Sequence, residues 1–205
     1  MDQARVELIS SYVEQLSHSL GGVNPLADKD ELKYWYDRGD YAALVGCIQK
    51  AMRLNLRIRL GYVNSGGPAG APAWVFLPNP MPLFGSSDFQ KLQVEMFLRK
   101  SFLEEANFEL VVMASSHELS HIVLSSIGHA LKAEEVAVDL TAMILGYRDI
   151  FVLGHQKAEP FNMVSEVMAV LFAGHGSAQY RSRWGYLTPE EARFASKVME
   201  RFSRS

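Results

Sequence analysis

The chain has 205 residues, of which 48% are hydrophobic and 21% charged, a composition that is typical of a globular domain and excludes a disordered chain. The 20 basic and 23 acidic residues give a net charge of −3, so no overall basic surplus attracts nucleic acid or an anionic membrane. The single cysteine, Cys47, excludes an intrachain disulfide framework.

The first part of the chain is predicted to form three helices. Residues 4–20 carry apolar side chains at helical spacing, and a glycine pair follows them. Asp28 or Asp30 is expected to cap a second, short helix, and Asp40 a third helix over residues 41–52. Charged residues stand where a signal peptide needs an apolar run, and no apolar run reaches about 18 residues. We therefore expect a cytoplasmic protein without a membrane span.

Two strands are expected after these helices. Polar and apolar side chains alternate over Arg57–Val63, and β-branched and aromatic residues are frequent in Ala73–Leu77. A loop rich in glycine, serine, proline and alanine connects them over residues 64–71. The pattern predicts that the two strands pair with each other as a hairpin with a long connection.

After Gly85 the chain is predicted to be helical to its end. Ser86 or Ser87 can cap the first of these helices, Asn107 the second, and Thr188 begins a capping box with Glu191. The expected helices cover residues 88–105, 108–127, 133–145 (stopped by Gly146), 161–172 and a final stretch from 189 onward. The fold class is therefore predicted as α+β, mainly helical, with a small antiparallel sheet ahead of the helix over 108–127.

The segment His117-Glu118-Leu119-Ser120-His121 lies inside that helix and carries the chemistry. Residues four apart share one helix face, so both imidazoles can point at one metal ion. Glu118 projects beside this face and can reach a water molecule on the metal without being a ligand. Zinc lowers the pKa of its bound water towards about 7, and the carboxylate can take the proton as hydroxide attacks a carbonyl. The motif predicts a zinc-dependent hydrolase, most simply a metalloprotease.

A third protein ligand is expected, because hydrolytic zinc usually has three. The next helix presents Glu135 and Asp139 on one face, one turn apart. If the helix with the motif continues to Ile127, it rises about 9 Å beyond His121. An antiparallel helix that starts near residue 133 needs about six residues to return to the level of His121. This length favours Asp139 as the third ligand. Glu135 remains the alternative ligand.

At this point the sequence resembles the gluzincins, and more narrowly the small single-domain zinc peptidases called minigluzincins. In those families one helix bears His-Glu-x-x-His and a later helix bears Glu-x-x-x-Asp, which Glu135 and Asp139 match here. The resemblance implies that Glu135 is the third zinc ligand and that Asp139 braces a ligand histidine. It further implies that strand 73–77 holds a protein or peptide substrate as an added strand. Glu135 follows His121 by 14 residues, which is short for this class.

The resemblance covers residues 55–146 and implies one zincin-like domain over residues 1–205. Residues 1–54 would form an N-terminal helical part, and residues 147–205 C-terminal helices. Within the last part, His155 and His175 are candidates for steadying an oxyanion, because each follows a glycine near a helix end.

Other classes of function stay open at this point. A non-catalytic regulatory or adaptor protein could use the same scaffold, although an intact Glu118 argues against it, since this residue is neither a ligand nor an obvious packing residue. A bacterial toxin or effector could carry the same motif. No nucleic-acid partner is expected on charge grounds, and the sequence leaves the oligomeric state undetermined.

Overall fold

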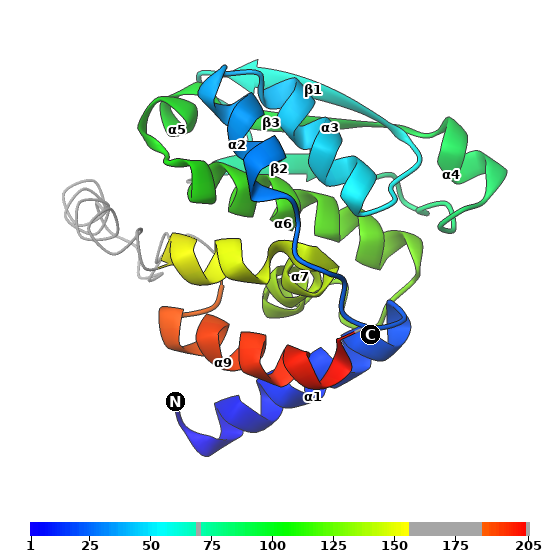
Figure 1. Cartoon of the computed structure of the whole chain (residues 1–205). Coiled ribbons are helices and arrows are strands. Elements are labelled where there is room, and N and C mark those ends of the chain that lie inside the picture. Colours follow the sequence, from blue (N-terminus) through cyan, green and yellow to red (C-terminus); the bar gives the residue numbers. More distant parts are fainter. Residues whose placement is uncertain (69–70, 156–185, 204–205) are drawn as a thin grey trace, which may run out of the picture.

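The computed structural model describes residues 1–68, 71–155 and 186–203, which form an α+β fold with helices around one three-stranded sheet (Figure 1). The strands are β1 (Arg57–Val63), β2 (Ala73–Phe76) and β3 (Gln93–Arg99). The helices are α1 (Gln3–Ser19), α2 (Lys29–Asp37), α3 (Tyr41–Ala51), α4 (Ser87–Lys91), α5 (Lys100–Glu105), α6 (Phe108–Ser126), α7 (Glu135–Ala142) and α9 (Pro189–Met199), with the π-helical segment η1 (Met143–Tyr147) and the short 3₁₀ helix η2 (Glu200–Phe202).

The three N-terminal helices form where the sequence predicts them. Asp28 caps α2 and accepts hydrogen bonds from two backbone N–H groups, and Asp40 caps α3 in the same way. The apolar stripe of α1 is buried through Ile9, Val13 and Leu16. The predicted α+β class is confirmed, and none of the helices in the described ranges is both long and apolar enough to cross a membrane.

The sheet differs from the predicted hairpin. β1 and β2 form as expected, but the strand order is β1-β3-β2, so β3 lies between them. β3 runs parallel to β1 and antiparallel to β2. The prediction of a single helix over residues 88–105 is therefore wrong. Val94, Met96 and Leu98 are buried on one face of β3, and this burial outweighs the local helix propensity of the segment.

Helix α6 carries the histidine motif through the interior, where it packs against β2, α3 and α7. Asn107 caps it as predicted, with its side chain accepting from the N–H of Leu110. Its buried residues include Leu119, Ile122 and Leu124, which have no exposed surface. α6 therefore presents its histidines from a helix that is fixed on several sides.

Helix α7 starts at Glu135, close to the predicted start near residue 133, and the helical geometry breaks at Gly146 as predicted. A second helix follows directly and continues over residues 148–155. Gly146 has φ 116, and a Cβ there would lie 2.6 Å from the carbonyl oxygen of Pro25. A glycine is required where this backbone passes so close, and its positive φ separates the two helices by a kink.

Helix α9, near the C-terminal end, packs beside the N-terminal helix α1. Thr188 and Glu191 form the predicted capping box. Glu191 is buried and accepts a hydrogen bond of 2.6 Å from the guanidinium of Arg5 on α1, beside which α9 lies in Figure 1. The helix predicted over 161–172 lies outside the described residues.

Candidate metal centre

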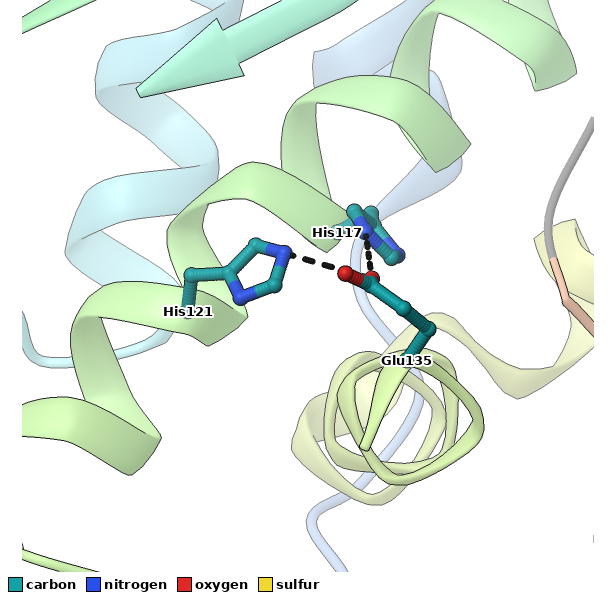
Figure 2. Close-up of side chains that lie close together, drawn as sticks. All are labelled: His117, His121 and Glu135. Atoms are coloured by element: carbon teal, nitrogen blue, oxygen red, sulfur yellow. Dashed lines mark ion pairs between the residues drawn. The ribbon is translucent and has the colours of Figure 1, made fainter. Parts of the chain in front are cut away.

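Three side chains from two helices converge at one point (Figure 2). His117 and His121 project from neighbouring turns of α6, and Glu135 is the first residue of α7. Oε2 of Glu135 lies 3.2 Å from Nε2 of His117 and 3.5 Å from Nε2 of His121. The three ligand atoms lie within 4.8 Å of one another. The helical spacing of the histidines thus produces the shared face that the sequence predicts.

The distances from Oε2 of Glu135 to the two imidazole nitrogens fit a tetrahedral zinc ion. Two ligands at about 2.1 Å from zinc lie about 3.4 Å apart in tetrahedral geometry. The two oxygen-to-nitrogen distances of 3.2 and 3.5 Å match that value. Oε2 of Glu135 is buried and makes no regular hydrogen bond within the described residues, although both imidazole nitrogens lie beside it. A carboxylate oxygen placed between two imidazole nitrogens is a donor set that suits zinc.

Asp139 binds the opposite side of the His117 ring. Its Oδ1 lies 2.8 Å from Nδ1 of His117, and its side chain is fully buried. Its Oδ2 accepts hydrogen bonds from the backbone N–H groups of Tyr186 and Leu187, at 2.6 and 3.2 Å. An ionised Asp139 makes Nδ1 the protonated nitrogen, which leaves the lone pair of Nε2 free for a metal.

The length argument that favoured Asp139 as the ligand does not match this arrangement. It assumed that α7 returns antiparallel to α6. Figure 2 instead looks along α7 at Glu135 while α6 runs across the view, so the two helices cross. Residues 128–134 carry the chain back before α7 begins, and Glu135 therefore already reaches the histidines. In the structure Glu135 lies beside both histidines, and Asp139 contacts His117 alone of the two.

Glu118 lies beside the ligand face and contacts the sheet. Its carboxylate accepts a hydrogen bond from the backbone N–H of Val75 on β2. Burial raises the pKa of Glu118, and the nearby charge of Glu135 adds to this effect, while His117 and His121 oppose it. A carboxyl whose pKa is raised towards neutrality is suited to take up and return a proton.

Without a metal, the ligand side chains pair with each other. Burial disfavours a charge on His117, but its hydrogen bonds to Asp139 and Glu135 outweigh burial and raise its pKa to about 10. Burial likewise opposes the charge on Glu135, but the two histidines lower its pKa to about 2. A positive imidazolium thus stands between two carboxylates, and a binding metal ion must displace its proton.

Comparison with known protein families, curated proteins and solved structures identified no match. No role can therefore be transferred to this chain from a relative. The geometry of His117, His121 and Glu135 carries the interpretation of the site.

Two further predicted residues have different outcomes. His155 is buried at the end of the helix over residues 148–155, and its ring packs edge-on to Phe151 at 6.1 Å. It does not belong to the group that could hold a metal. His175 lies outside the described residues. Tyr186, which the sequence did not indicate, stacks on His117 with a centroid distance of 5.6 Å.

Proposed function

We propose that this protein is a zinc-dependent peptidase in which His117, His121 and Glu135 hold the metal. The observation that carries the proposal is the convergence of their three ligand atoms, with Oε2 of Glu135 at the spacing of tetrahedral zinc from both imidazole nitrogens. Three protein ligands leave a fourth position for water or substrate, as in catalytic zinc sites. Zinc bound there would polarise a substrate carbonyl and lower the pKa of a water molecule.

Glu118 is the general base of this proposal, and then the general acid. It follows His117 directly on α6, so it projects beside the two imidazoles without joining the ligand group. The N–H of Val75 fixes its carboxylate, and burial raises its pKa. The side chain can accept a proton from water and then return it to the leaving amine.

The edge of the sheet favours a peptide as the substrate. β2 is an edge strand whose inner neighbour is β3. The N–H of Val75 points at Glu118 and therefore away from β3, so the open edge of β2 faces the site. An extended peptide that adds to this edge would pass Glu118 with its backbone aligned. This arrangement agrees with the zincin-like fold that the resemblance implies, and with a protein or peptide partner.

Metal analysis together with a protease assay tests the proposal. Wild-type protein should bind close to one zinc per chain and cleave an unfolded protein such as casein. Glu118→Gln should keep its zinc and lose activity by about 100-fold or more, because the base contributes that much to proton transfer. Full activity in this variant would refute the role of Glu118, and absence of zinc in the wild type would refute the site. Zinc binding without cleavage of the substrate would favour a non-catalytic adaptor protein instead of a peptidase.

A further inference from the structure

We propose that Tyr186 and the peptide groups of residues 186–187 are positioning elements of the metal site, although they come from the C-terminal part of the chain. The two N–H groups hold Asp139 for His117, and the ring of Tyr186 holds the plane of the His117 imidazole. This inference rests on the proposed binding of zinc by His117 and extends it to a segment outside the motif helices.

The first step concerns Asp139, whose two oxygens have separate tasks. Oδ1 contacts Nδ1 of His117, and Oδ2 accepts the N–H groups of Tyr186 and Leu187. A fully buried carboxylate needs such donors to stay ionised, and hydrogen bonds to a charged oxygen are stronger than neutral ones. The peptide groups therefore fix the direction in which Oδ1 of Asp139 points. The orientation and tautomer of His117 follow from that direction.

The second step concerns the ring of His117. The Tyr186 ring lies over its face with an interplanar angle of 22°. His121 meets it at 83°, with a centroid distance of 4.9 Å. Together with Asp139 in the plane of the ring, these contacts oppose rotation of the imidazole. The His117 side chain is 12% exposed, whereas Tyr186 is 45% exposed, so the tyrosine forms the outer layer.

The third step concerns the anchoring of residues 186–187. Leu187 is buried, and Thr188 directly follows it as the cap of α9. α9 is in turn tied to α1 through the pair of Glu191 and Arg5. The peptide that holds Asp139 is thus fixed by the packing of the two terminal helices. Metal affinity and the docking of this segment are therefore coupled, and each must strengthen the other.

Zinc affinity of tyrosine variants tests the ring. Competition with a chromophoric chelator should show about 10-fold weaker binding for Tyr186→Ala, within the range known for groups behind a ligand. Tyr186→Phe keeps the ring and should bind within about twofold of wild type. Tyr34 on α2 has a similar exposure of 48% and contacts Trp35, so Tyr34→Ala is the matched control and should not change affinity. Unchanged affinity in Tyr186→Ala, or an equal loss in Tyr186→Phe, would overturn the proposed role of the ring.

Amide hydrogen exchange tests the coupling, which a merely structural role of the segment would not produce. Zinc should slow exchange of the Tyr186 and Leu187 amides at least several-fold in wild type and have no such effect in His117→Ala. In Asp139→Asn the side chain has one acceptor oxygen, which cannot accept from His117 and from both peptide N–H groups. This variant should therefore speed exchange of the Tyr186 and Leu187 amides even without metal. If wild type binds zinc and neither amide responds, the inference fails and the proposed function stands. If wild type binds no zinc, both fail.

Discussion

His117 and His121 are the same residue type one turn apart on α6, yet their surroundings differ. His117 contacts Asp139 through Nδ1, Glu135 through Nε2 and Tyr186 through its ring face. The described contacts of His121 are its pair with Glu135 and its edge contact with His117. The side chain of His121 is also more exposed, 22% against 12%. Within the described part of the chain, two histidines that look equivalent in the sequence therefore differ in how many contacts hold them.

The largest expected effect separates the ligand Glu135 from the brace Asp139. Glu135→Gln should weaken zinc binding by more than about 100-fold, because it removes the charged ligand atom, whereas Asp139→Asn should weaken it about 10–100-fold. Zinc competition with a chelator measures both. A greater loss in Asp139→Asn than in Glu135→Gln would exchange the two roles and restore the assignment that favours Asp139.

A second prediction compares the two histidines without metal. His117→Ala leaves Oδ1 of the buried Asp139 without its partner and should lower the free energy of unfolding by about 1–3 kcal/mol. His121→Ala breaks a partly exposed pair and should cost less than about 1 kcal/mol. Urea denaturation of the metal-free proteins measures the difference. Equal costs would show that His121 is as firmly held as His117.

A third prediction concerns the pH dependence of metal-free stability. The pKa of His117 is raised in the folded protein from 6.5 to about 10, so its stabilising contribution is complete below about pH 6.5 and is lost as the pH rises through about 10. Urea midpoints between pH 6 and 10 should fall more steeply for wild type than for His117→Ala. His121→Ala should retain most of the wild-type slope. Parallel curves for wild type and His117→Ala would contradict the ion pair.

Much of the fold follows from signals that act within a few residues. Asp40, Asn107 and Thr188 cap the helices that the sequence predicts, because a cap depends on a side chain and the next backbone N–H groups. β3 was missed because strand pairing depends on distant partners, in its case β1 and β2. The alternation of Val94, Met96 and Leu98 was a signal that could have identified it.

The residues of the candidate site likewise differ in whether local sequence signals predict them. His117, Glu118 and His121 follow from helical spacing alone. The choice between Glu135 and Asp139 depends on how α7 crosses α6, which residues 128–134 determine and periodicity does not. Tyr186 lies 47 residues beyond Asp139, and no local pattern connects them. Side chains that share one helix face can therefore be predicted from the sequence, whereas contacts between distant segments depend on how the helices cross.

The strand order has a consequence for folding during synthesis on the ribosome. β1 and β2 leave the ribosome before β3, and neither has a partner in the sheet until residues 93–99 follow them. β1 and β2 cannot pair as a hairpin, because the central strand is made last, and the parallel pairing of β1 with β3 joins segments far apart in the chain, which slows folding. The edge beside Glu118 is thus assembled only when α6 itself is about to be synthesised. A nascent chain stopped before β3 would expose two unpaired strands, the kind of surface that chaperones recognise.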